Sequence, residues 1–377
     1  PYGVFSIQRR DAAGVDYFLI TSNLTDPAQV EVRINTGKPC LWLDVENSQV
    51  VCTFEREARL ALPPCVCRVV VSADETALAS FRSAFPSAPT YTREEPLPLA
   101  AFRFTALAPN ALRLDFQRYQ DSRALADASD AARWSALAAA PAAAFGSPAF
   151  PENSFYAARA VFRAEAVPAG LRLETERLFG QRLFCNGTEL VGGRDEQRLG
   201  EPYAVYEVAA LVKAGMNTLV AVGRSSSIRR SYSVPFAMLT GDFLLDREHT
   251  LVAKTDLPCP GDWTAAGYPQ YGGTGRYEVD IEVRDDPPAA IRFETADSVT
   301  LWLDGKPVGQ KMGAPYVFPL AGLTAGRHRL RADVTGTLHN LYYGTVAPRP
   351  AGQHNGGTLP AGITGAALLY EGRSRRS

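Results

Sequence analysis

The sequence lacks an excess of charge of either sign. Its 39 basic and 40 acidic residues nearly cancel over 377 positions, and only five of the basic residues are lysine. A protein that binds nucleic acid or an anionic membrane surface needs a basic patch to meet the phosphate groups. The composition therefore predicts neither of these partners and favours an uncharged one.

Long hydrophobic runs are also missing. No window approaches the eighteen apolar residues that a bilayer-crossing helix requires, and the longest candidate, SALAAAPAAAF, is alanine-rich and interrupted by Pro141. The sequence thus predicts no membrane-spanning helix. It begins without Met and without a basic then apolar signal segment, which indicates a processed chain or a piece of a longer one. Localisation inside or outside a bacterial cytoplasm stays open.

Motifs for metal binding and nucleophilic catalysis are absent as well. The six Cys form no C-x-x-C pair, and the four His are too dispersed to complete a zinc site. Neither a Gly-x-Ser-x-Gly elbow nor a phosphate loop occurs. Buried free thiols are the expected state of the Cys residues, because Cys is among the most buried residue types. A disulfide among Cys40, Cys52, Cys65 and Cys67 stays open.

Strand signals dominate what is present. Residues 1–76 contain short runs such as QVEVRI and CRVVVSA, rich in β-branched residues and separated by turn formers, and they predict a small antiparallel β-sandwich. For residues 77–100 the sequence predicts a short helix followed by a Pro-rich connector. A chain of this length is expected to hold two or three domains. The fold class predicted is all-β.

An internal repeat organises the rest of the chain. LRLETE, an Asn186-Gly187 turn and AGMNTL follow one another in the first copy. IRFETA, an Asp304-Gly305 turn and AGRHRL follow in the same order in the second copy. Such turns between alternating segments are strong hairpin signals. We therefore predict two β-sandwiches of one type, at 101–246 and 247–377, with a helical insertion at residues 122–140 in the first.

This order of strands and turns resembles the galactose-binding-like jelly roll that accompanies many glycoside hydrolases. GDWTAAGYPQYGGTGRYEVDIEV is similar to the opening of such a module in glycoside hydrolase family 106, the α-L-rhamnosidase-like enzymes. VTGTLHNLYYG resembles the closing strand of that module, and DYFLITSNLTDPAQVEVRI resembles the small sandwich that follows the catalytic barrel. The resemblance implies an accessory region, carbohydrate-binding or structural, of an enzyme that acts on rhamnose-type or related plant glycans.

The resemblance also implies partners and a missing part. The sequence shows no series of alternating strands and helices from which an (α/β) barrel could form. The resemblance therefore implies that the catalytic barrel lies upstream in the same parent chain. We expect this chain alone to be non-catalytic and to contact a glycan. Modules of this type often hold a structural Ca²⁺, so that ion is compatible with the sequence. Two alternatives are a stand-alone carbohydrate-binding or adhesion protein, and a complete enzyme with a site between sandwiches.

Two pairs of acids could in principle serve a glycosidase, which needs two carboxyl groups across a sugar ring. They are Glu174 with Glu176, and Asp280 with Glu282. Each pair has an i, i+2 spacing that places both acids on one strand face. Because Arg172, Arg177 and Arg284 are neighbours in the sequence, we expect ordinary solvated ion pairs rather than a catalytic site.

Aromatic residues supply the candidate sugar contacts, since a ring face packs against the C–H groups of a pyranose. The candidates are Trp263, Tyr268, Tyr271 and Trp302, with His339 and Asn340 as neighbouring polar groups. The competing interpretation makes Trp263 a plug of the core, Trp302 a packing residue, and His339 and Asn340 residues that fix a turn. Aromatic residues pack inside proteins more often than they form platforms.

Overall fold

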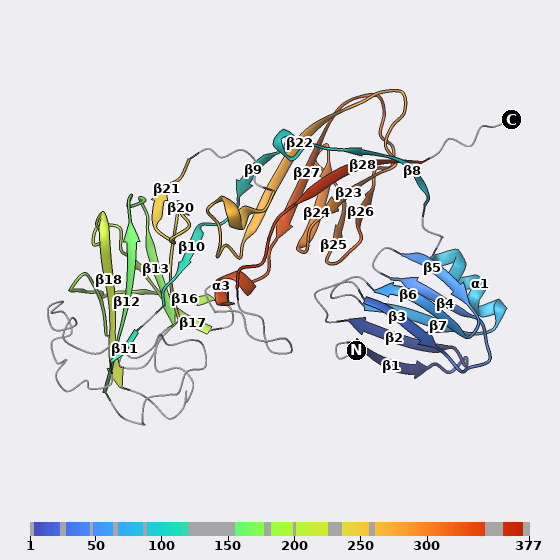
Figure 1. Ribbon diagram of the computed structural model, residues 1–377, viewed down its shortest axis with the longest axis horizontal. Coiled ribbons are helices and arrows are strands. Elements are labelled where there is room, and N and C mark those ends of the chain that lie inside the picture. The colour runs from blue at the N-terminus through green and yellow to red at the C-terminus, as the bar shows by residue number, and fades with distance from the viewer. Residues whose placement is uncertain are drawn as a thin grey trace. The chain divides into compact units, whose positions relative to one another are not determined.

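A computed structural model describes most of the chain as a nearly all-β protein, as the sequence predicts (Figure 1). It describes residues 4–22, 28–45, 48–62, 67–85, 89–115, 117–119, 155–176, 182–198, 201–224, 236–255, 261–343 and 357–371. The predicted helix at 122–140, Arg177, Cys65 and Cys259 fall outside these ranges. No helix within them has the length and apolarity needed to cross a bilayer.

The chain divides into two compact units built from segments that are distant in the sequence. The first unit contains Pro1–Phe104, Arg276–Thr335 and Gly362–Ser377. The second contains Thr105–Gly275 and Gly336–Ala361. The chain therefore enters the second unit twice, and each unit depends on contacts between remote residues.

The N-terminal part of the first unit is a β-sandwich backed by a helix. The order of its larger sheet is β1-β2-β7-β4-β5, with bounds Val4–Arg10, Asp16–Ser22, Cys67–Ser72, Cys40–Asp44 and Gln49–Phe54. The smaller sheet pairs β3 (Ala28–Arg33) with β6 (Glu57–Leu62). Trp42, 1% exposed, lies in the core between the sheets, and α1 (Glu75–Ala84) covers the other face of the larger sheet.

Local sequence explains these elements. The side chains of β3 alternate between half-buried and exposed along the strand, which is the pattern of a sheet with one wet face. α1 begins after Asp74, whose carboxylate accepts a hydrogen bond from the Ala77 backbone N–H at 2.9 Å, as an N-cap does. The predicted short helix is confirmed. Cys40, Cys52, Cys67 and Cys185 are free thiols, and Cys67 is exposed.

The second unit contains two further sheets. The order of one is β10-β19-β13-β17-β16, with bounds Asn110–Arg113, Ala237–Gly241, Arg172–Glu176, Glu201–Glu207 and Arg194–Arg198. The order of the other is β15-β14-β18-β12-β21-β20, with bounds Thr188–Glu189, Arg182–Cys185, Gly215–Arg224, Phe155–Ala164, Leu251–Ala253 and Phe243–Leu245. β11 (Gln117–Tyr119) pairs with β12. A buried apolar cluster that includes Phe162, Leu173 and Leu219 joins the two sheets.

The C-terminal sandwich also has two sheets. The order of the first is β25-β24-β27-β22-β9, with bounds Lys306–Lys311, Ser298–Leu303, Gly326–Thr335, Thr274–Val283 and Arg103–Ala106. The order of the second is β26-β23-β28-β8, with bounds Tyr316–Pro319, Ala290–Glu294, Gly365–Glu371 and Tyr91–Pro96.

Three short helices complete the described elements: η1 (Leu99–Ala101), η4 (Trp263–Ala266) and α3 (His339–Tyr343).

Two strands of this sandwich, β8 and β9, precede the second unit in the sequence. Figure 1 shows them in teal beside orange and red strands from the end of the chain. The sequence places residues 77–100 in a connector, but β8 pairs with β28 along its whole length. β8 is an edge strand whose Thr-Arg-Glu-Glu side chains are exposed. It therefore lacks the apolar alternation by which a strand is recognised from sequence.

The repeat is visible in equivalent hairpin turns. Asn186 and Gly187 have φ values of 49° and 84°, and Asp304 and Gly305 have 50° and 77°. Two successive residues with positive φ define the type I′ turn that suits a β-hairpin. Each turn joins corresponding strands, β14 to β15 in the first copy and β24 to β25 in the second. The predicted hairpins are confirmed.

Each turn is fastened to the long strand beside it in the same way. The Asn186 N–H donates to the Thr218 carbonyl oxygen at 2.8 Å, and the Thr218 N–H donates to Asn186 Oδ1 at 2.9 Å. In the second copy, the Asp304 N–H donates to the Arg329 carbonyl oxygen at 2.9 Å, and the Arg329 N–H donates to Asp304 Oδ1 at 2.8 Å. Thr218 and Arg329 both follow their strand-initial glycine by three positions.

A second side chain from the long strand also contacts each turn, and its residue type differs between the two copies. In the first, Asn217 contacts the turn residue Asn186 at 2.8 Å and donates to the Lys213 carbonyl oxygen at 2.7 Å. In the second, His328 occupies that place, with Nδ1 2.7 Å from the turn carboxylate and Nε2 2.9 Å from the Thr324 carbonyl oxygen. The contact between Asp304 and His328 can therefore be an ion pair, whereas the contact between Asn186 and Asn217 is uncharged.

We expect His328→Asn to remove a pH-dependent contribution to stability. The carboxylate of Asp304, then the carbonyl of Thr324, raises the pKa of His328, while His328 lowers the pKa of Asp304. The imidazolium stabilises the fold below about pH 6.5 and that contribution is lost as pH rises through the folded-state pKa. The Asp304 carboxylate contributes to stability above about pH 4, and this contribution is lost as pH falls through the lowered pKa of Asp304.

The measurement is thermal unfolding of wild type and H328N between pH 4 and pH 9. The difference in midpoint should be largest near pH 5 to 6 and shrink by pH 9. His249→Asn serves as the control, because Asn tolerates the positive φ of 59° at that position. An H328N curve parallel to that of wild type across the whole range would show that the His328–Asp304 pair does not act in this way.

Candidate functional site

The aromatic stretch around Trp263 lies inside the second unit. η4 begins after Asp262, whose Oδ1 accepts from the Thr264 N–H at 2.9 Å, and the helix ends at Gly267 in the left-handed region with φ 91°. A Cβ at Gly267 would lie 2.9 Å from the side chain of Leu244. The Trp263 backbone N–H donates to the Ala361 carbonyl oxygen at 3.0 Å. These contacts fix the stretch against two remote parts of the unit.

The three rings of the stretch form one buried cluster. Trp263, Tyr268 and Tyr271 are 0%, 5% and 2% exposed, and the ring centroid of Tyr271 lies 5.7 Å from Trp263 and 5.5 Å from Tyr268. The Tyr271 hydroxyl accepts from the Ala108 N–H at 3.0 Å and donates to the Thr274 carbonyl oxygen at 2.8 Å. A sugar platform needs an exposed ring face. The geometry favours the interpretation of these rings as core packing.

His339 and Asn340 fix a loop of the same unit. The Asn340 amide donates to the Leu359 carbonyl oxygen and accepts from the Leu359 N–H, both at 2.8 Å, and Asn340 is 4% exposed. His339 Nε2 lies 3.0 Å from the Gly357 carbonyl oxygen. Both polar groups are thus engaged with backbone 18 or 19 residues downstream. The geometry favours the turn-fixing interpretation for both residues.

Trp302 is the one aromatic candidate of the four that keeps substantial exposed surface. It lies on β24 directly opposite Arg331 of β27. The Arg331 guanidinium lies 3.8 Å from the ring centroid and covers one face of the indole. Such stacking contributes about 0.5–1 kcal/mol at an exposed site. Trp302 therefore offers at most one free ring face to a ligand.

The acid pairs differ from expectation in their surroundings. Glu174 is 3% exposed and accepts a hydrogen bond from the Thr240 hydroxyl at 2.8 Å, so it is not a solvated surface acid. Arg172 lies 4.0 Å from Glu207 instead.

Asp280 is paired with Arg329 and Arg327 rather than with its sequence neighbour Arg284. Hydrogen bonds from Arg329, then from Arg327, hold the pKa of Asp280 well below its usual range. A general acid must keep its proton near neutral pH, so Asp280 does not fit that role.

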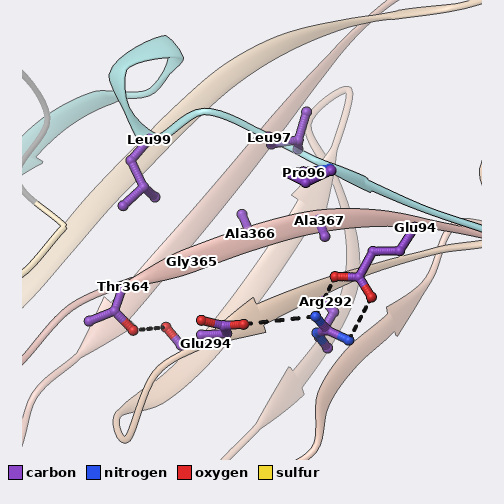
Figure 2. Close-up of a pocket in the computed structure, with 10 residues that line it drawn as sticks. All are labelled: Glu94, Pro96, Leu97, Leu99, Arg292, Glu294, Thr364, Gly365, Ala366 and Ala367. Atoms are coloured by element: carbon purple, nitrogen blue, oxygen red, sulfur yellow. Dashed lines mark hydrogen bonds and ion pairs between the residues drawn. The ribbon is translucent and has the colours of Figure 1, made fainter.

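A pocket that the sequence did not predict lies on the C-terminal sandwich. It has a volume of about 300 Å³ and is lined from β8, η1, β23 and β28 (Figure 2). Its aliphatic wall comes from Pro96, Leu97, Leu99, Ala366 and Ala367. Its polar groups come from Glu94, Arg292, Glu294 and Thr364. This combination of an apolar wall and a few convergent polar groups is typical of small-molecule sites.

Arg292 is the centre of the polar side. Its guanidinium donates two hydrogen bonds to Glu94, one of them 3.0 Å long, and lies 3.8 Å from Glu294 (Figure 2). The Arg292, Glu94 and Glu294 side chains are 36%, 43% and 62% exposed, so solvent reaches all three. One guanidinium thus serves two carboxylates. The arrangement offers donors and acceptors to a hydroxyl-rich ligand.

Gly365 makes room for the Glu294 side chain. The two residues face each other across β23 and β28. A Cβ at Gly365 would lie 2.5 Å from Glu294 Oε2 and 2.8 Å from its carboxyl carbon. The Thr364 hydroxyl donates a hydrogen bond to the Glu294 backbone carbonyl oxygen at 3.1 Å. The carboxylate can therefore lie flat over β28 only because residue 365 has no side chain.

The internal repeat provides a direct comparison for this pocket. Strand pairing makes four residue pairs equivalent between the copies: Arg172 and Arg292, Glu174 and Glu294, Met238 and Gly365, and Thr240 and Ala367. In the first copy Met238 is 7% exposed and packs in a buried cluster with Leu341 of α3. Larger side chains thus occupy the place that Gly365 and Ala367 leave open.

Both carboxylates of the pocket lie against one guanidinium, which differs from the two carboxyl groups that a glycosidase places on either side of a sugar ring. Across the described ranges, no group of three or more His, Cys, Asp or Glu side chains is placed to hold a metal ion. Sequence reasoning missed the site because Glu94 lies 198 residues from Arg292. The internal repeat is the one usable signal. When the paired strands of the two copies are aligned, Gly365 corresponds to Met238, a much larger residue.

Several of the solved structures that resemble this chain are glycosidases. No protein-family model matches the chain, and no curated protein sequence does. Similar solved structures include a β-glucuronidase of Ruminococcus gnavus, at 13% identity over 58% of this chain and 40% of that one. They include a rhamnosidase of a Novosphingobium species, at 11% identity over 97% and 24% of the two chains. An α-L-rhamnosidase of Streptomyces avermitilis with L-rhamnose matches at 12% identity over 97% and 39%.

These similarities are distant. The TM-score is 0.28 for each of the three structures, so the alignments carry no argument about the activity of this chain. The chain spans well under half the length of each of these enzymes.

We expect Trp263→Ala to destabilise the second unit rather than to remove a ligand contact. Replacing a fully buried Trp by Ala costs about 3–5 kcal/mol, because it removes buried surface and leaves a cavity. Trp302→Ala, at a partly exposed ring, should cost far less. Denaturant unfolding of both variants measures the difference. Equal and small losses for the two variants would argue against Trp263 as a core residue.

Proposed function

We propose that this chain is an accessory region of a glycoside hydrolase and that it binds a saccharide in the pocket around Arg292. The parent enzyme would act on rhamnose-type or related plant glycans, and a catalytic barrel would precede these sandwiches in the parent chain. The jelly-roll resemblance in the sequence supports the accessory role. The all-β architecture of the described residues is compatible with it.

The observation that carries the proposal is the chemistry of the pocket. Sugar hydroxyls both donate and accept hydrogen bonds, and Glu94, Arg292 and Thr364 supply both kinds of partner next to an aliphatic wall. A volume of about 300 Å³ is at the small end for ligand pockets, which fits one or two sugar residues. We expect dissociation constants around millimolar, because a small open site buries little area against the entropic cost of association.

A stand-alone carbohydrate-binding or adhesion protein would use the same pocket. The two proposals differ in what precedes the chain in its gene. A reading frame that continues upstream of Pro1 into alternating strands and helices would support the accessory region. A signal peptide directly before Pro1 would support the stand-alone protein.

We expect Gly365→Met to abolish saccharide binding while the protein stays folded. The substitution imports the residue that fills the equivalent place in the first copy, where Met238 is accommodated beside Glu174. Calorimetric or NMR titration with methyl α-L-rhamnoside and methyl β-D-galactoside would show at least a tenfold loss of affinity. The effect should hardly depend on salt, because these sugars are uncharged.

Gly309→Met is the matched control. Gly309 lies on β25 of the same sandwich, and a Cβ there would meet only Phe318, at an ordinary 3.9 Å. This variant should bind like wild type. Wild-type protein that binds no saccharide, or a Gly365→Met variant that binds normally, would overturn the proposed function.

A further inference from the structure

We infer that the pocket selects uncharged sugar residues over those that carry a carboxylate, and that Glu294 determines this selectivity. The inference rests on the proposed function, because it assumes that a saccharide occupies the pocket. It names a substrate class for the site and a specificity residue within it.

The lining of the pocket carries more acidic than basic groups. Among the ten residues around the pocket, Glu94 and Glu294 are acidic and Arg292 is basic. With both acids ionised, the site carries one net negative charge. A ligand carboxylate entering this space would meet more negative than positive charge.

The single positive charge of the lining is already paired with a carboxylate of the protein. Arg292 makes two hydrogen bonds with Glu94, so its planar fork is already engaged with a carboxylate. Glu294 lies 3.8 Å from the guanidinium, which is an ion pair beyond hydrogen-bond length. The Glu294 carboxylate therefore keeps acceptor capacity for a ligand hydroxyl and repels a ligand anion.

Glu294 is exposed and lines the pocket. Its side chain is 62% exposed and lies against Gly365, where any Cβ would displace it. Figure 2 shows the carboxylate between Thr364 and Arg292. Its counterpart in the first copy, Glu174, is buried and held by the Thr240 hydroxyl. Only the Glu294 carboxylate, of these two, faces a space that a sugar can enter.

The size of the effect follows from Coulomb's law. Because the groups are solvent-exposed, the dielectric constant of bulk water applies, and two like charges about 5 Å apart then repel enough to weaken binding roughly three- to tenfold. Added salt should reduce the effect, since exposed charges are screened. The competing outcome is that a uronate displaces Glu94 and takes Arg292 for itself. That outcome would make the acidic sugar bind as well as the neutral one, or better.

The test compares two ligands that differ only at C6, methyl β-D-glucoside and methyl β-D-glucuronide, together with the corresponding galactose and galacturonate pair. Affinities are measured by NMR titration at low and at 0.5 M salt. For wild type we expect each uronide to bind roughly three- to tenfold more weakly than its neutral partner at low salt. In Glu294→Gln the ratio should fall close to one, because the amide keeps its size and loses its charge.

Glu189→Gln provides the matched control, since Glu189 pairs with Arg182 on an exposed surface of the second unit. It should leave the ratio unchanged. Gly365→Ala gives a second, independent readout, because it forces Glu294 to move and should also change the ratio.

The outcomes separate the two proposals. Equal or tighter binding of the uronides by wild type, or a ratio that Glu294→Gln leaves unchanged, would overturn the inference and leave the saccharide-binding function standing. Failure of every sugar to bind wild type would overturn the proposed function itself.

Discussion

The antiparallel pairing of β8 with β28 is the constraint on which the C-terminal sandwich depends. Pro96 lies opposite Ala367, Glu94 lies opposite Leu369, and the Leu97 N–H extends the pairing to the Ala366 carbonyl oxygen at 2.8 Å. Without β8, the backbone of β28 would form an open sheet edge, which proteins generally cover. The same pairing brings Glu94 to Arg292. One set of main-chain hydrogen bonds thus closes the sandwich and builds one wall of the pocket.

The two repeated sandwiches show how a few side chains change one place in the same fold. Both copies keep the hairpin turn and the fastening of that turn to its long strand. They differ where β13 and β23 face their neighbours: Met238 fills the space in the first copy, and Gly365 leaves it open in the second. The first copy places its acid, Glu174, in a buried hydrogen bond. The second leaves Glu294 exposed at a pocket.

Much of the fold could be predicted from sequence because its signals are local. The β class, the repeat and the two positive-φ turns all follow from residue alternation and from Asn-Gly and Asp-Gly pairs. β8 could not be predicted, because an edge strand with exposed charged side chains has no apolar period. The pocket could not be predicted either, since its polar groups meet only through strand register. The sequence of the aromatic stretch allows two interpretations, and the burial of Trp263 favours packing.

The most direct test of the saccharide-binding account is NMR of methyl-labelled protein during titration with a neutral methyl glycoside. Leu97, Leu99 and Ala367 line the pocket, and Ala367 lies opposite Arg292 on the same face of the sheet. The account requires that the methyl groups of these three residues show the largest saturable shifts, while buried methyl groups of the second unit such as those of Leu173 stay unchanged. Saturable shifts confined to other parts of the chain, or no shifts at saturating sugar, would contradict it.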